Sequence, residues 1–144
     1  MDAASSRVVV ALRETFSQTV WAPFFLVLLH FVLRASDVYN AIAALDTAMH
    51  FTGGIAMSYV AARFVSRAHR EALFVSRHRV FEALLIVSVT VIAAVCWEFL
   101  ELLFEPIGDA QVKNGRIDTL EDLAAGIGGA CTFILVWWSQ PRQS

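Results

Sequence analysis

Four long stretches of the chain carry no formally charged side chain, and shorter segments that contain charges separate them. The uncharged stretches lie between these pairs of charged residues: Glu14 and Arg34, Asp46 and Arg63, Glu82 and Glu98, and Asp122 and Arg142. Each approaches the length of about 20 residues that a helix needs to cross the hydrocarbon core of a bilayer. A soluble helical protein would need a polar stripe along each helix, and these stretches lack one. The sequence therefore predicts an all-α polytopic membrane protein.

Composition agrees with a membrane protein and argues against other classes. Of the 144 residues, 58% are hydrophobic and 17% are charged, whereas about 25% of the residues of a soluble domain are charged. The net charge is −2 and there is no basic domain, so we expect no nucleic-acid partner. Cys96 and Cys131 both lie in uncharged stretches, which favours small buried hydrophobes over a disulfide framework. Residues 1–14 are polar or mixed, and no small-residue cleavage site follows them, which argues against a cleavable signal peptide.

We expect one transmembrane domain over residues 1–144, folded as a bundle of four membrane-spanning helices. The spans are expected at about residues 16–34, 40–65, 81–104 and 119–138. Residues 1–15 precede them as an interfacial or flexible leader. Trp21 near the start of the first span, and Trp137 and Trp138 near the end of the last, are typical of the aromatic belts at membrane surfaces.

The distribution of basic residues predicts how this bundle lies in the membrane. With four spans, one side of the membrane receives eight arginines: Arg7, Arg13, Arg63, Arg67, Arg70, Arg77, Arg79 and Arg142. The other side receives three basic residues: Arg34, Lys113 and Arg116. Because basic loops are retained in the cytoplasm, both termini are expected there, and the connections around residues 34–40 and 105–118 face outward. The five arginines between the second and third spans serve chiefly as this topogenic signal, although they could also attract anionic lipid headgroups.

This topology brings ionisable side chains from three helices to the outward end of the bundle. Asp46 and His50 are four residues apart, Glu98 and Glu101 three, and Asp118 and Asp122 four, so each pair shares one face of its helix. The deeper members form an inner layer: His50, Glu98 and Asp122. The others form an outer layer: Asp46, Glu101 and Asp118. A carboxylate within a span costs on the order of 3 kcal/mol, so such groups usually face the bundle interior and have a partner.

Two kinds of chemistry suit this cluster. His50 with Glu98 and Asp122 is a hard, oxygen-rich ligand set for a divalent metal ion, which could polarise a phosphoryl oxygen or activate water. Alternatively, crowded carboxylates share protons with His50 as an acid/base pair or a proton relay. In a catalytic site, Asp46 would orient His50, and Arg116 would receive a phosphate or carboxylate of the substrate.

Several of these residues also have purely structural explanations. Asp118 with Glu121 matches a capping box that opens the fourth span. Glu101 could lie at headgroup depth without a partner. His30 in the first span is more typical of a satisfied polar residue than of a ligand. Small residues such as Gly53 and Gly126 allow close helix packing, which needs no functional explanation.

The motifs resemble those of the VanZ-like family of small bacterial membrane proteins and its uncharacterised relatives. The resemblance rests on the order of three motifs: Asp46-Thr-Ala-Met-His50, Trp97-Glu98-Phe-Leu-Glu101, and Gly115-Arg116-Ile-Asp118 with Asp122. It covers roughly residues 40–135. Thr47, Glu101 and Gly126 stand where that family has lysine, glutamine and asparagine, which makes this cluster more acidic. The resemblance implies a role at the bacterial cell envelope, in the cytoplasmic membrane, and supplies no reaction; the founding member is linked to resistance to a lipoglycopeptide antibiotic.

Two functional hypotheses follow, and the sequence leaves open whether the protein is an enzyme. In the first, an outward-facing Asp/His/Glu site, with or without a divalent metal ion, acts on or binds a lipid-linked or envelope substrate. In the second, the protein is an accessory or scaffold subunit whose polar cluster fixes helix register, with other membrane subunits or further copies of itself as partners. A proton or ion pathway is less favoured, because the cytoplasmic halves of the second and third spans show no matching chain of polar residues. They are apolar apart from Ser58, Tyr59, Ser88 and Thr90.

Overall fold

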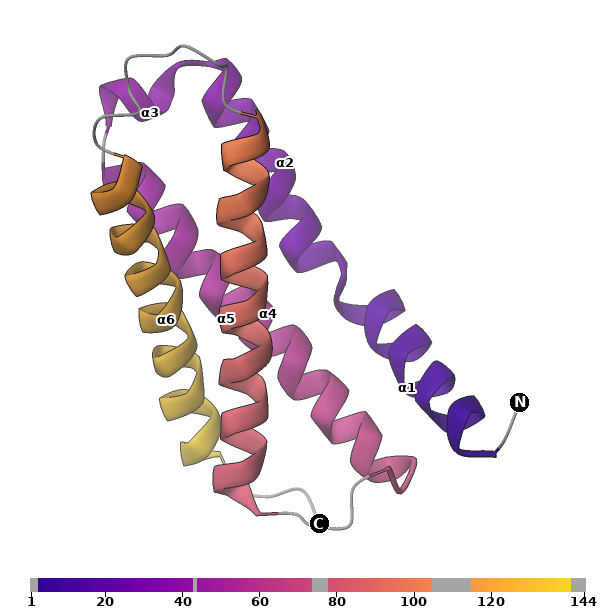
Figure 1. The fold of residues 1–144 in the computed structure, drawn as a ribbon. Coiled ribbons are helices and arrows are strands. Elements are labelled where there is room, and N and C mark those ends of the chain that lie inside the picture. Colours follow the sequence, from indigo (N-terminus) through magenta and orange to yellow (C-terminus); the bar gives the residue numbers. More distant parts are fainter. Residues whose placement is uncertain (1–2, 43, 74–77, 105–114, 141–144) are drawn as a thin grey trace.

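The computed structural model describes residues 3–42, 44–73, 78–104 and 115–140. These residues form five long helices and one helix of a single turn, and they contain no strand (Figure 1). The helices are α1 (Ala3–Thr19), α2 (Trp21–Ala35), α3 (Val38–Ala41), α4 (Ala44–Arg70), α5 (Arg79–Phe104) and α6 (Gly115–Ser139). The expected all-α fold is confirmed.

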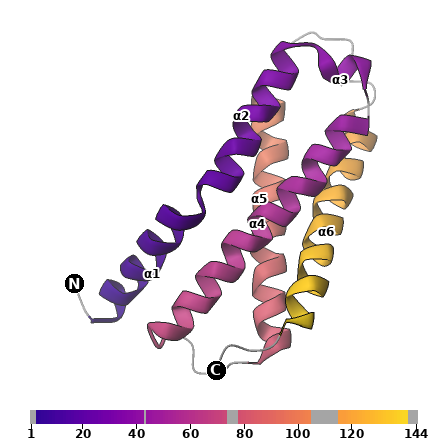
Figure 2. The same cartoon turned by 180° about the vertical axis from the view of Figure 1, so that it is seen from behind.

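Helix α4 is the centre of the molecule and contacts each of the other helices. It packs with α5 and α6 as a bundle, whereas α1 and α2 form an arm along its other side (Figures 1 and 2). At one end of the molecule α1 begins, α4 ends, α5 begins and α6 ends; we call this the arginine end, because Arg7, Arg67, Arg70 and Arg79 lie there. At the opposite end, the acidic end, α4 begins, α5 ends and α6 begins.

The core of the bundle consists mainly of small side chains, and the large apolar ones lie outside. Ala61, Ala62, Val65 and Ile86 form a buried cluster between α4 and α5. Large side chains on the outer surface are exposed, among them Phe24, Phe25, Leu84, Ile92 and Leu135. So much exposed apolar surface is unusual for a soluble monomer and suits contact with lipid.

Two helices are long and apolar enough to cross a membrane, namely Arg79–Leu103 of α5 and Ile117–Ser139 of α6. Ser5–Thr19 and Trp21–Ala35 pass the same test as a pair, although they are bent by 50°. Length and composition thus support two spans, or three if the bent pair is one span. Helix α4 does not meet this criterion. The expected count of four spans is therefore higher than the two or three that length and composition support.

The first expected span differs from the structure. Residues 1–15 were expected to be an interfacial or flexible leader, with a single helix at 16–34, but α1 continues to Thr19 and α2 starts at Trp21. The bend follows from Pro23, which has no N–H to donate to the carbonyl of Thr19 and whose ring crowds that carbonyl. The second span, expected at 40–65, also differs, because α3 ends at Ala41 and α4 continues to Arg70.

Helix α1 is fixed to α4 near the arginine end. Ala11, Thr15 and Thr19 are buried at four-residue spacing along one face. The guanidinium of Arg67, which is only 3% exposed, donates to Gln18, and its Nε lies 3.6 Å from a carboxylate oxygen of Glu14. This buried cation therefore ties the arm to the central helix.

Two further contacts close the bundle at the arginine end. Nε2 of His69 lies 2.9 Å from a carboxylate oxygen of Glu82, which joins α4 to α5. Arg79 donates to the carbonyls of Trp138 at 2.6 Å and Gln140 at 3.0 Å. A cation at a helix C-terminus satisfies carbonyls that have no partner within the helix.

The close approach of α4 and α6 that the small residues allow is confirmed. A side chain added at Gly54 would overlap the backbone carbonyl of Gly126, and one added at Gly129 would overlap the carbonyl of Phe51. Both contacts are between backbones, so a side chain cannot move aside to relieve them. These two glycines set the distance between the helices.

We predict that Gly54→Ala destabilises the protein, because the added methyl group forces α4 and α6 apart. Overpacking of this kind costs about 1–3 kcal/mol. Gly53→Ala is the matched control, since an added Cβ there meets nothing within 4 Å and alanine favours helix. Thermal unfolding in detergent should show a lower midpoint for Gly54→Ala alone. Equal midpoints for the two variants would contradict the close contact.

Candidate functional site

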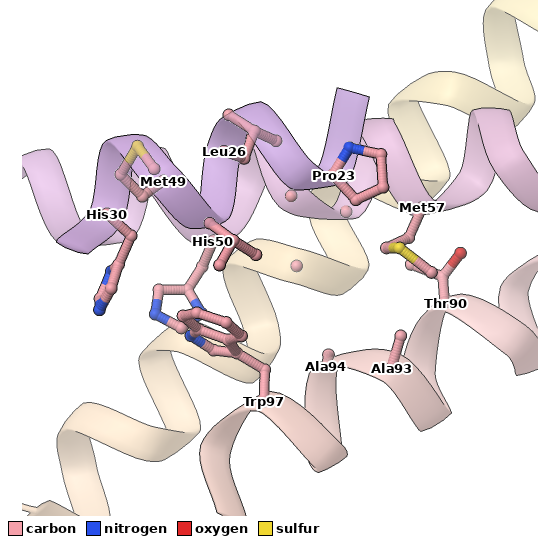
Figure 3. A pocket seen from close by; sticks show the side chains of 14 residues that line it. Pro23, Leu26, His30, Met49, His50, Met57, Thr90, Ala93, Ala94 and Trp97 are labelled. Atoms are coloured by element: carbon pink, nitrogen blue, oxygen red, sulfur yellow. The ribbon is translucent and has the colours of Figure 1, made fainter. Parts of the chain in front are cut away.

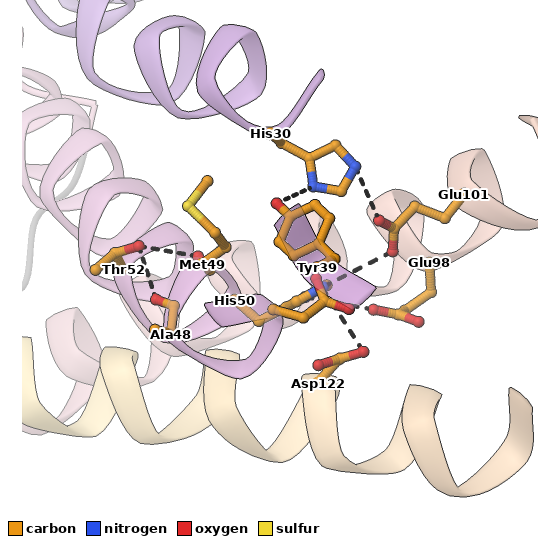
Figure 4. A network of polar contacts seen from close by, with 10 residues as sticks. His30, Tyr39, Ala48, Met49, His50, Thr52, Glu98, Glu101 and Asp122 are labelled. Carbon is orange, nitrogen blue, oxygen red and sulfur yellow. Dashed lines mark hydrogen bonds and ion pairs between the residues drawn. The ribbon is translucent and has the colours of Figure 1, made fainter. Parts of the chain in front are cut away.

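His50 of α4 lies at the centre of a cluster of carboxylates near the acidic end (Figure 4). Its Nε2 atom lies 3.7 Å from Asp46, 3.8 Å from Glu101 and 3.7 Å from Asp122, and its Nδ1 atom lies 3.5 Å from Glu98. The carboxylates come from α4, α5 and α6. The structure therefore brings together ionisable groups from the three helices that the sequence analysis selected.

A second histidine extends the cluster towards α2. Nε2 of His30 lies 3.3 Å from one oxygen of Glu101, whose other oxygen faces His50. The hydroxyl of Tyr39 in α3 lies 3.0 Å from Nδ1 of His30, within hydrogen-bond distance. The ring of Trp97 packs edge-on against His30, with 5.1 Å between centroids. Glu101 thus links two histidines from different helices.

The inner members of the cluster are shielded from their surroundings, whereas the side chain of Asp46 is 33% exposed. The side chain of His50 is 7% exposed, and the residues Glu98 and Asp122 are 8% and 5% exposed. In the part of the chain that the structure describes, one oxygen of Glu98 and one of Asp46 are buried without a hydrogen-bond partner. Buried carboxylates without partners carry a large desolvation cost unless a proton or a cation offsets it.

The spacing of the donor atoms fits metal ligation better than hydrogen bonding. Separations of 3.5–3.8 Å between His50 and its four carboxylates are longer than a normal N–H···O hydrogen bond. Two overlapping groups have all of their ligand atoms within 4.8 Å of one another: Asp46 with His50 and Asp122, and His50 with Glu98 and Glu101. An imidazole nitrogen and several carboxylate oxygens together suit Zn²⁺, Mn²⁺ and related divalent ions.

Glu101 belongs to the cluster around the two histidines. Its side chain is 20% exposed and faces both histidines. The alternative that Glu101 has no partner is therefore wrong. Sequence spacing placed Glu101 outside Glu98 along α5, and it did not show that α2 would approach that turn of the helix.

Of the two remaining sequence candidates, the structure describes the side chain of Asp118 and not that of Arg116. Asp118 is exposed and belongs to neither potential metal-binding group among the described residues. The capping-box explanation for Asp118 and Glu121 is also wrong, because α6 already begins at Gly115 and Asp118 lies within its first turn. The side chain of Arg116 falls outside the described residues, so its expected role as an anion ligand stays a prediction.

His30 and Tyr39 are members of the site that the sequence did not predict. One signal was available for His30, because it shares a helix face with Arg34 and points to the same end as the acidic residues. Tyr39 gave no signal, since its contact depends on the turn between α2 and α4. Burial raises the pKa of the Tyr39 phenol to about 12, and the nearby carboxylates of Asp46 and Glu101 act in the same direction.

A cavity of about 150 Å³ reaches the cluster from the middle of the bundle. Apolar and small side chains of α2, α4, α5 and α6 line most of it. His30, His50 and Trp97 lie at one end, and Met57 and Thr90 lie at the other (Figure 3). The site thus combines a polar end with an apolar chamber, which we call the inner cavity.

The pKa of Tyr39 gives a direct test of this geometry. The tyrosinate absorbance is titrated in the parent protein and in Tyr39→Phe. The difference between the two curves isolates the Tyr39 phenol. The difference curve should have its midpoint near pH 12, since burial disfavours the charged phenolate relative to an ordinary value of about 10. A midpoint near 10 would mean that Tyr39 is in water and not against His30.

Comparisons with known proteins assign the chain to a family. A family profile matches residues 6–143, nearly the whole chain, and its description is "Predicted membrane protein (DUF2238)". Neither the comparison with curated proteins nor the comparison with solved structures gave a match. The matching profile supports a membrane protein and does not name the VanZ-like family that the motifs resemble. The chain belongs to the DUF2238 family of integral membrane proteins.

Proposed function

We propose that the protein binds a divalent metal ion at His50 and uses it to act on a lipid-linked substrate of the cell envelope. The observation that carries the proposal is the convergence of His50 with carboxylates of three helices, with ligand atoms of two groups within 4.8 Å of one another. The inner cavity supports a lipid-linked substrate, because it gives an apolar chain access to the same residues.

Charge balance favours a bound cation over an empty polar cluster. Four carboxylates surround His50. Among the described residues, no lysine or arginine forms an ion pair with any of the four. A buried oxygen of Glu98 faces Nδ1 of His50 without a hydrogen bond. A divalent ion would offset this negative charge and satisfy that oxygen at once.

The ligand set suggests the chemistry. His50, Asp46 and Asp122 form one candidate set, and His50, Glu98 and Glu101 form the other. When bound, a divalent ion of this kind polarises a phosphoryl or carbonyl oxygen, or lowers the pKa of a water molecule. Carboxylates that do not ligate the ion remain beside it as proton acceptors, and the buried surroundings exclude bulk water.

The proposed setting is a bacterial cytoplasmic membrane with four spans, both termini inside and the acidic end facing outward. The arginine distribution supports this orientation, since the described arginines of α4 and α5 lie at the opposite end from His50 (Figure 1). The resemblance of the motifs around Asp46, Glu98 and Asp122 to the VanZ-like family supports a role at the cell envelope. In this setting the site meets substrates in the outer leaflet.

A second candidate function is an accessory or scaffold subunit without catalysis. The contacts among His30, Tyr39, Glu101 and His50 join α2, α3, α4 and α5, and a connected polar network of this kind fixes helix register. Partners would be other membrane subunits or a second copy of the chain. In this case the polar residues would matter for stability and would hold no metal.

We predict that Asp122→Asn and His50→Ala lower metal binding, while Glu121→Gln leaves it unchanged. Glu121 is the matched control, because it is the exposed neighbour of Asp122 and belongs to neither ligand group. Elemental analysis of purified protein should find stoichiometric metal in the parent chain and in Glu121→Gln. A ligand in hundredfold excess over its Kd adds about 2.7 kcal/mol of stability, so Mn²⁺ or Zn²⁺ should also raise the unfolding temperature of those two proteins.

Two outcomes would sink the metal proposal. One is a parent protein without bound metal whose unfolding temperature no divalent ion changes. The other is equal metal content in the parent, Asp122→Asn and His50→Ala. If the first outcome is joined by a marked loss of stability in His50→Ala, the scaffold function is the better one.

A further inference from the structure

Helix α2 stands apart from α5, and this separation leaves an opening beside the candidate site. No α-carbon of α2 lies within 8 Å of an α-carbon of α5. The described polar and aromatic contacts between the two helices come from His30, which reaches Glu101 at 3.3 Å and the ring of Trp97 at 5.1 Å between centroids. Side chains, rather than packed backbones, therefore close the gap.

The gap contains two hollows that share a wall. The inner cavity lies on the side of the bundle interior. A second hollow, which we call the outer recess, has a volume of about 220 Å³ and is lined by Val27, His30, Phe31, Arg34, Trp97, Leu100 and Glu101. Val27, His30 and Trp97 line both. The two hollows thus adjoin at these side chains, where the rings of His30 and Trp97 pack edge-on.

The inner cavity suits a segment of hydrocarbon chain. It runs along α4 from His50 to Met57 (Figure 3), about 10 Å at 1.5 Å per residue. Its volume of about 150 Å³ matches an engineered apolar cavity that stays dry and binds benzene. It is therefore too small for a whole lipid and large enough for part of one chain.

The outer recess adds a positive charge at the mouth. Arg34 is exposed there, four residues from His30 and on the same face of α2. Glu101 is the carboxylate that lines the recess, and it is engaged with His30. A guanidinium at this position can pair bidentately with a phosphate or carboxylate.

We infer that the gap between α2 and α5 admits an anionic amphiphile from the membrane, with its headgroup on Arg34 and part of its chain in the inner cavity. The apolar side chains of α2 and α5 on either side are exposed, so the gap opens where lipid surrounds the protein. The bond between head and chain then lies beside His30 and His50. Only the reaction at that bond rests on the proposed function. Binding of the amphiphile itself needs no metal.

The test is photo-crosslinking of the protein, purified in a neutral detergent, with dodecyl phosphate that carries a diazirine at the chain end. Three variants are compared with the parent: Arg34→Gln, Gly53→Leu and Arg63→Gln. Gly53 lines the inner cavity, and an added Cβ there meets nothing within 4 Å, so leucine can fill the cavity without a backbone clash. Arg63 is an exposed arginine of α4 away from the recess and is the matched control for Arg34.

In the parent protein and in Arg63→Gln, crosslinks should map near Met57 and Thr90. Arg34→Gln should weaken labelling about tenfold, as expected for one lost charge-assisted contact. Gly53→Leu should remove the labels at Met57 and Thr90 while leaving labels on the outer apolar surface. Because Arg34 is exposed, its variant tests the inference even if the cavity-filling variant does not fold.

Three results would overturn the inference. Equal labelling by the uncharged dodecanol analogue, unchanged in Arg34→Gln, would show apolar adsorption alone. Competition by inorganic phosphate at the same concentration as the probe would show a site for free phosphate. Labels that Gly53→Leu leaves in place would show that the chain lies outside. The double variant Asp122→Asn, Glu98→Gln separates the two proposals. It removes one ligand from each candidate metal set, and neither residue lines the inner cavity, so it should lose metal and keep the crosslinks.

Discussion

The contact between α4 and α6 is the constraint on which the site depends. Gly54 and Gly129 let the two backbones touch, and Gly126 lies against the backbone of His50. Asp122 is one turn before Gly126 on α6, so its distance from His50 is set by this approach. Larger residues at the crossing would move the carboxylate away from the imidazole without changing either residue.

The charges of the chain are sorted to opposite ends of the bundle. At the arginine end, Arg67 is buried against Glu14 and Gln18, and Arg79 closes the end of α6. Near the acidic end, the ion-pair partners of His50 are four carboxylates. The first arrangement pairs a cation with an anion, although Nε and one terminal nitrogen of Arg67 are buried without a hydrogen bond. The second leaves a negative excess that calls for a proton or a cation.

Much of the helical framework could be predicted from the sequence, because uncharged stretches and residue spacing are local properties. The spacing of Asp46 and His50 on one helix face follows from the helical repeat alone. The break at Val20 does not follow from the apolar composition of residues 16–34. Its local signal is Pro23, which leaves the carbonyl of Thr19 without a backbone donor. The contacts of Glu101 with His30, and of His30 with Tyr39, depend on how far α2 leans towards α5. Such distances arise from packing between helices and have no periodic signal in the sequence.

The glycine crossing and the open side of α2 have a thermodynamic consequence when taken together. Helices α4 and α6 share a continuous backbone contact, whereas α2 is joined to α5 by the side chain of His30. Regions with few packed contacts open at lower free energy than the core, often as separate cooperative units. Helix α2 should therefore open at lower free energy than the crossing of α4 and α6. Trp21 lies in α2 and Trp137 in α6, so these two residues report on regions of different stability.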